Sequence, residues 1–370
     1  MVLAATRRIV FKVGSRLLTD MPDASEATRI EELVAALARV KERGYEVLLV
    51  SSGAIAAGMM LTETRTRPTD ISQLQSLAAL GQGRLMSLYE RACQTHGFHC
   101  AQVLLSRDDV RDRHRHLNVR NCLHDLLSRG SLPVINENDV VSVDEICFGD
   151  NDCLAALVGA MMRAELTVML TTTAGFRRRE GEELGQRLAL IRRLTPDLRR
   201  MAGESADATY SVGGMRSKLD AAEILLDAGE SLWIADGHDF DIIDRLMNGA
   251  DEGTLFLPAT PQLSSSKRWL AFFAEPAGEV RVDAGAARTL RRQGSSLLPS
   301  GIIAVTGTFA VGDTVRIVDA DGDAVAVGVT NYAASDLDRI QGKRSSQVAE
   351  IMGELVHEEV VHRDNLALVG

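Results

Sequence analysis

Two lysines, each within four residues of a glycine, are the side chains in this sequence best suited to contact a phosphate. Lys12 lies in an apolar run at 9–13 and is followed by Gly14 and Ser15. A glycine there permits a sharp turn whose N–H groups can point at an anion, and the lysine adds a positive charge. Lys218 follows Gly213-Gly214 and precedes a predicted helix at 219–228. The spacing is not that of a Walker A loop, and either glycine turn alone is more often structural.

A stretch of small residues, Ser51 to Gly58, follows a second apolar run at 47–50. Small residues let a helix begin close to a ligand, and the free N–H groups of its first turn attract a carboxylate or a phosphate. An ordinary serine cap on a tightly packed helix gives the same pattern. The stretch therefore indicates a helix start, with anion binding and simple capping as equal alternatives.

Acidic and amide side chains gather at two further places, Asn136 to Asp139 and Gly149 to Asp152. Such residues are common in solvated turns. They can also bind an ammonium group, orient a lysine or hold Mg²⁺. Because these clusters also lie at predicted strand ends, we favour a functional interpretation.

The elements that must position these motifs alternate between strands and helices. Helical spacing is clearest at Ile30, Leu33, Val34, Leu37 and Val40, and the predicted strands are 9–13, 47–50, 101–105, 132–135, 166–170 and 231–235. This alternation predicts an α/β fold with a mainly parallel sheet and helices on both faces. Ligands of such sheets bind at the carboxyl ends of the strands, where the motifs above occur.

The pattern changes near residue 260, where Pro258, Pro261 and three serines suggest a linker. Beyond it, β-branched segments at 279–282, 302–305, 314–318 and 324–329 predict a small β-rich domain. We therefore expect one domain over 1–262 and a second over 275–356.

Composition restricts the class of protein. The net charge of −10 argues against nucleic acid or an anionic membrane as the main partner. Five cysteines without a C-x-x-C pair predict reduced thiols and a cytoplasmic location. The first residues show no secretory signal, and no apolar run in the middle of the chain is long enough to span a bilayer.

Taken together and in order, these motifs resemble the glutamate 5-kinases, a branch of the amino acid kinase family with a C-terminal PUA domain. The matching segments are Phe11 to Ser15, Ser52 to Gly58, Val134 to Asp139, Gly149 to Asp152, Gly213 to Met215 with Lys218, Gly253 to Phe256, Lys267 to Trp269 and Gly294 to Pro299. The resemblance covers nearly the whole chain. It implies phosphorylation of the glutamate side-chain carboxylate by ATP, the first step of proline synthesis.

The resemblance also implies roles for individual residues. Lys12 and Lys218 would stabilise the transferring phosphoryl group, and Asp150 would hold the two lysines in position. Ser52, Asp139 and Asn151 would bind glutamate, with Asp152 close to that pocket. The nucleotide site would comprise Lys12, Gly14, Ser15, Thr171, Thr172, Val212, Gly213, Gly214, Met215, Arg216, Ser217 and Lys218.

Further expectations follow from the same resemblance. Mg²⁺ would accompany ATP, proline would act as a feedback inhibitor, and the chain would form a homo-oligomer. A glutamyl phosphate reductase would be a partner enzyme. Around Thr172 the sequence departs from the family, since it lacks the usual acidic residue and the Asp-Pro-Arg loop and carries Arg177-Arg178-Arg179 instead.

Three alternatives remain at this stage. The first is an amino acid kinase for another acidic substrate. The second is a catalytically weak regulatory relative, although Lys12, Lys218 and Asp150 are all present. The third is an RNA-binding protein, which we disfavour because residues 279–353 carry eight basic and nine acidic residues, a net charge of −1.

Overall fold

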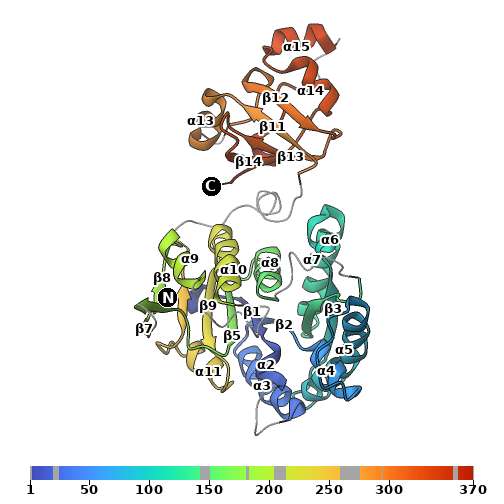
Figure 1. The fold of residues 1–370 in the computed structure, drawn as a ribbon, viewed down its shortest axis with the longest axis vertical. Coiled ribbons are helices and arrows are strands. Elements are labelled where there is room, and N and C mark those ends of the chain that lie inside the picture. Colours follow the sequence, from blue (N-terminus) through green and yellow to red (C-terminus); the bar gives the residue numbers. More distant parts are fainter. Residues whose placement is uncertain are drawn as a thin grey trace. The chain divides into compact units, whose positions relative to one another are not determined.

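The computed structural model describes residues 2–19, 25–141, 151–180, 183–203, 214–258, 276–293, 295–352 and 357–369 (Figure 1). The chain divides into two compact units. The first comprises Met1–Val110 and His114–Gln262, and the second comprises Arg111–Arg113 and Leu263–Gly370.

The first unit is built on an eight-stranded sheet with the order β3-β4-β2-β1-β5-β9-β10-β8. Neighbouring strands from β3 to β9 are parallel, and β10 runs antiparallel to β9. The strands are β1 (Arg8–Val13), β2 (Glu46–Ser51), β3 (Cys100–Leu105), β4 (Leu132–Glu137), β5 (Leu166–Thr171), β8 (Leu190–Ile191), β9 (Ser231–Asp236) and β10 (Thr254–Phe256). A separate hairpin joins β6 (Arg177–Glu180) to β7 (Glu183–Arg187).

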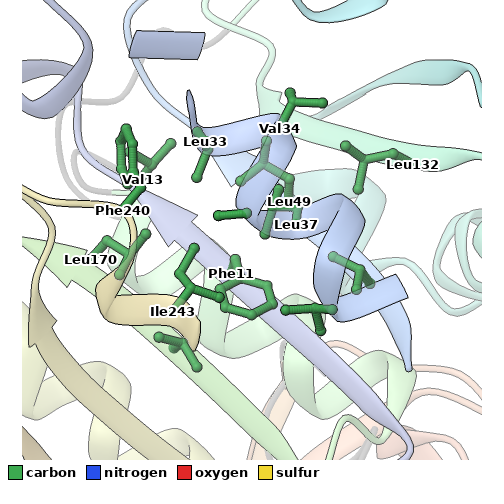
Figure 2. Packing of buried hydrophobic residues seen from close by; sticks show 14 of the residues in the cluster. Phe11, Val13, Leu33, Val34, Leu37, Leu49, Leu132, Leu170, Phe240 and Ile243 are labelled. Carbon is green, nitrogen blue, oxygen red and sulfur yellow. The ribbon is translucent and has the colours of Figure 1, made fainter. Parts of the chain in front are cut away.

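Helices cover both faces of this sheet. They are α1 (Val2–Ala5), α2 (Ser15–Thr19), α3 (Glu26–Glu42), α4 (Ala54–Leu61), α5 (Ile71–Gln94), α6 (Arg107–Arg111), α7 (Arg113–Ser128), α8 (Asn151–Met162), α9 (Pro196–Gly203), α10 (Met215–Ala228) and α11 (Ile242–Met247). On one face, α3, α5 and α11 share a hydrophobic core with Phe11 and Val13 of β1. Figure 2 shows Phe11 and Leu49 of the sheet together with Leu33 and Leu37 of α3.

The alternation of side chains along β1 decides which residues face the other helices. Since Phe11 and Val13 enter the core beneath α3, Lys12 between them points to the opposite face. Helix α8 lies there and contacts β1, β2, β4 and β5. This alternation places Lys12, although it lies in an apolar strand, on the face of the sheet that α8 covers.

The second unit contains a five-stranded sheet with the order β12-β11-β13-β14-β15. Its elements are β11 (Gly278–Val282), α13 (Ala284–Gln293), β12 (Ile302–Gly307), β13 (Thr314–Val318), β14 (Ala324–Val329), α14 (Ala334–Ile340), α15 (Ser345–Met352) and β15 (Leu366–Leu368), with short 3₁₀ turns at Pro299–Gly301 and Arg363–Asn365. It has a hydrophobic core of its own, which includes Val280, Ile317 and Leu337.

The α/β fold and the small β-rich domain are confirmed, and each strand predicted by its apolar run is present. The short strands β8, β10 and β15 and the β6–β7 hairpin were missed, because two- to five-residue strands carry little periodicity. The helix predicted at 219–228 begins earlier, at Met215, so Lys218 lies within its first turn. Among the described residues, no helix is long and apolar enough to cross a membrane.

Candidate active site

The two lysines singled out by the sequence meet on one carboxylate. Lys12 Nζ lies 2.6 Å from Asp152 Oδ1, and Lys218 Nζ lies 2.9 Å from Asp152 Oδ2. Asp152 is fully buried, and the two lysines are 6% and 7% exposed. Ser217 Oγ also donates to Asp152 Oδ2, over 3.1 Å. Among the described residues, one buried carboxylate therefore joins the two ammonium groups and a hydroxyl.

Local packing explains how three distant segments reach this point. Lys12 sits in the central strand, paired with Val50 on one side and Met169 on the other. Helices α8 and α10 approach closely at Gly159, where an added Cβ would lie 2.9 Å from Leu225 and 2.8 Å from Thr167. This contact brings the first turn of α10, with Lys218, beside the first turn of α8, with Asp152.

The sequence interpretation gave the role of holding the lysines to Asp150 and placed Asp152 near the substrate. In the structure Asp152 bridges the two ammonium groups. Asp150, Val212 and Gly213 lie outside the described residues. Asp152 is thus a described residue that contacts both lysines, and the role predicted for Asp150 stays a prediction.

A hydrogen-bond network of amides and hydroxyls adjoins this cluster through Asn151, the neighbour of Asp152. Asn151 Nδ2 donates to Ser52 Oγ at 2.6 Å, to Asn136 Oδ1 at 3.0 Å and to the Ser51 carbonyl at 3.3 Å. Asn136 Nδ2 in turn donates to Gln82 Oε1 at 3.0 Å. The sequence predictions Ser52 and Asn151 are thus brought together.

Glycines set the geometry around Ser52. Gly53, which precedes α4, has φ +118°, a left-handed conformation that side chains rarely adopt. Helices α4 and α5 then cross at Gly81, where an added Cβ would lie 1.8 Å from the Ala54 carbonyl oxygen. Only glycine permits this approach, which carries the next residue, Gln82, to the site.

Asp139 follows the end of β4 and has an unusual acidity. Burial raises the pKa of Asp139 to about 6; the negative charge of Glu137 adds to the shift, and Arg67 opposes it. A carboxylate in this setting gains from a cationic partner, such as the ammonium group of an amino acid.

The remaining predicted residues lie at the ends of elements that carry or adjoin the two lysines. Gly14 connects β1 to α2, which begins at Ser15. Strand β5, next to β1, ends at Thr171, and Thr172 follows it. Gly214 precedes α10, and Met215, Arg216 and Ser217 form its first turn with Lys218. Thr172, Gly214 and Arg216 are exposed. Exposed backbone and side chains beside two ammonium groups suit a polyanion that arrives from solvent.

Gln82 was missed at the sequence level, and Asn136 was noticed without an assigned role. The signal for Gln82 was available, since it is an amide on the buried stripe of α5, among Leu77, Ala78, Leu85 and Leu88. A buried amide needs hydrogen-bond partners, and its partner here belongs to the site.

The arrangement has two adjoining parts. Two ammonium groups and the start of α10 can neutralise phosphate oxygens, and an adjoining set of amides, a hydroxyl and Asp139 can hold a small polar molecule. No covalent intermediate is required for phosphoryl transfer, which depends on positioning and on charge stabilisation.

Two models of known families match this chain. The model for the amino acid kinase family matches residues 7–236, and the model for the PUA domain matches residues 278–352. The solved structure of carbamate kinase from Giardia lamblia bound to AMP-PNP is 17% identical, with a TM-score of 0.48, and covers 70% of this chain and 100% of that one.

Curated relatives resemble the chain over its whole length. The glutamate 5-kinase of Syntrophus aciditrophicus (strain SB) is 41% identical over 370 residues, covering 100% of this chain and 96% of that protein. The glutamate 5-kinase of Trichlorobacter lovleyi is 42% identical over 370 residues, covering 100% of this chain and 98% of that protein. The chain therefore belongs to the amino acid kinase family and carries a C-terminal PUA domain.

Proposed function

We propose that this chain is a glutamate 5-kinase, which transfers the γ-phosphoryl group of ATP to the side-chain carboxylate of glutamate. The observation that carries the proposal is the adjacency of Asn151 and Asp152. Asp152 holds Lys12 and Lys218, and Asn151 binds Ser52. Full-length relatives of that activity at about the same identity, 41% and 42%, support it.

The physical difficulty of the reaction is that two anions must meet. An oxygen of the glutamate carboxylate attacks the γ-phosphorus, a new O–P bond forms, and the bond to the β-phosphate oxygen breaks as ADP leaves. Lys12 and Lys218 would hold the phosphoryl oxygens while charge shifts toward ADP. Ser52, Asp139 and Asn151 would hold glutamate so that its carboxylate lies in line with that bond.

Among the described residues there is no group of three or more His, Cys, Asp or Glu side chains placed to hold an ion. Asp152 already contacts two ammonium groups. We propose that Mg²⁺ enters with ATP, coordinated by the phosphate oxygens, as is common for this ion. No step above depends on a protein ligand to the metal.

The proposal places the chain at the first step of proline synthesis, in the cytoplasm. The proposal also includes a homo-oligomeric state, inhibition by proline, and a partner reductase that consumes the acyl phosphate. The net charge of −10 supports a small-molecule substrate over nucleic acid.

The test is an assay of the purified chain with ATP, Mg²⁺ and glutamate, with aspartate and N-acetylglutamate as alternative substrates. ADP release is followed by coupling, and the acyl phosphate is trapped with hydroxylamine as a hydroxamate. We expect both products with glutamate at the highest kcat/KM. A preference for another acid would move the chain to a different substrate. Glutamate binding by calorimetry without ADP release would instead indicate a regulatory protein.

A further inference from the structure

Gln82 is connected to the proposed substrate-binding residues through Asn136, to which the sequence assigned no role. It projects from the buried stripe of α5 and is 7% exposed. Its Oε1 accepts a hydrogen bond from Asn136 Nδ2 over 3.0 Å. The crossing of α4 and α5 at Gly81 fixes the backbone next to it.

A backbone N–H group determines which way the side-chain amide of Asn136 is oriented. The N–H of Glu137 can only donate, and it donates to Asn136 Oδ1 at 2.9 Å. Asn136 must therefore direct its Nδ2 toward Gln82, whose Oε1 accepts the hydrogen bond. Two hydrogen bonds thus fix the orientation of the Asn136 amide: one from the N–H of Glu137 and one to Gln82 of α5.

The orientation of the Asn151 amide depends in turn on its hydrogen bond to Asn136. Its Nδ2 faces three acceptors, Asn136 Oδ1, Ser52 Oγ and the Ser51 carbonyl, so its two N–H groups are fully used. Its Oδ1 is buried and has no hydrogen-bond partner among the described residues. An unpaired buried acceptor is unfavourable until a donor arrives.

We infer that Gln82 is a positioning residue, which acts through Asn136 to make Asn151 present its oxygen to the α-ammonium group of the substrate. The inference rests on the proposed function and deepens it. An ammonium group would donate a hydrogen bond to Asn151 Oδ1, whereas an N-acylated substrate offers a neutral amide in its place. Gln82 therefore favours free amino acids, although it need not touch them.

The experiment compares Gln82→Met, which removes the acceptor, with Gln82→Glu, which keeps an acceptor oxygen and removes the amide donor. Gln73→Met, an exposed glutamine on the same helix, is the matched control. Loss of one well-placed hydrogen bond predicts that Gln82→Met raises the KM for glutamate about tenfold. We expect kcat and the KM for ATP to stay within about twofold of the wild type, because the phosphate side is untouched. Gln82→Glu should stay near the wild type.

A double-mutant cycle with Asn151→Ala separates the relay from a direct contact. If Gln82 acts through Asn151, then Gln82→Met adds nothing in the Asn151→Ala background. An undiminished tenfold effect there would overturn the inference, as would an unchanged glutamate KM in folded Gln82→Met. Should Gln82→Met fail to fold, Gln82→Glu decides, since a tenfold rise in its glutamate KM contradicts an acceptor role. Wild-type protein without glutamate-dependent ADP release would refute the proposed function instead.

Discussion

Lys12 on β1 and Lys218 on α10 place their ammonium groups on the two oxygens of a single buried carboxylate, that of Asp152. Without Asp152 the two like charges would repel each other in a region with little water. With it, the two ammonium groups are bridged by one carboxylate and keep a fixed geometry. This fixed, buried charge is what a phosphoryl transfer between two anions needs before substrates arrive.

Replacing Lys218 tests the charge itself. Lys218→Ala should lower kcat about 10²-fold, equivalent to about 3 kcal/mol of transition-state stabilisation. The fold should persist, as judged by circular dichroism. Lys343→Ala, an exposed lysine of the second unit, serves as the control. Near-normal turnover in folded Lys218→Ala protein would exclude this role.

Replacing Asp152 tests the support of that charge. Asp152→Asn keeps the shape but removes the carboxylate that neutralises two buried ammonium groups. We expect the free energy of unfolding to fall by about 3 kcal/mol, with loss of activity. Urea denaturation measures the stability, and Asp125→Asn, on an exposed carboxylate, is the control. Unchanged stability and activity would mean that the pairing contributes little.

Asp139 should make glutamate use depend on pH. Its pKa of about 6 means that it becomes neutral as the pH falls below that value and then attracts an ammonium group less. We expect kcat/KM for glutamate to decrease as the pH drops below about 6. This decrease should be absent in Asp139→Asn. The same substitution should raise the KM for glutamate more than the KM for ATP. A decrease that persists in Asp139→Asn would assign the titration elsewhere.

The same shift has a consequence for stability. The pKa of Asp139 is raised from its ordinary 3.8 to about 6, so between these values the folded chain binds the proton more tightly than the unfolded chain. Its contribution to stability is present below pH 3.8 and is lost as the pH rises through about 6. Asp139→Asn should therefore unfold at higher urea concentration than wild type at pH 7.5, with the difference shrinking toward pH 4.

The kinase unit should work without the second unit. Every candidate site residue lies before residue 262, and the two units have separate hydrophobic cores. Residues 1–262 should thus keep kcat within a few-fold of the full chain. A truncated protein that is folded by circular dichroism but inactive would show that the C-terminal domain completes the site.

The segment 171–179, from the end of β5 into β6, should weaken discrimination between nucleotide bases. Thr172 is exposed and offers a short neutral hydroxyl where the family usually has an acidic residue. The phosphate contacts from Lys12 and Lys218 do not depend on the base. We expect kcat/KM for GTP to approach that for ATP. A preference for ATP above ~100-fold, about 2.7 kcal/mol, would show that other residues read the base.

The sequence alone determined the sheet and the edge at which chemistry occurs. Its apolar runs are long enough to define β1, β2, β4 and β5. Because parallel strands place their carboxyl ends together, the sequence predicted Lys12, Ser52 and Asp139 at one edge of the sheet. The sequence also indicated Lys218 as a phosphate-contacting residue, because it follows Gly213 and Gly214. The start of its helix, at Met215, was not predicted.

Only the tertiary structure decided which neighbouring residue does what. Asp152 and Asn151 are adjacent on α8, and successive helical residues point about 100° apart, so the orientation of α8 against β1 and α10 determines which side chain reaches the lysines. The same holds for Gln82, whose contact with Asn136 depends on how closely α5 crosses α4 at Gly81. Spacing along a chain fixes the face of one element, whereas a contact between elements depends on the packing of all of them.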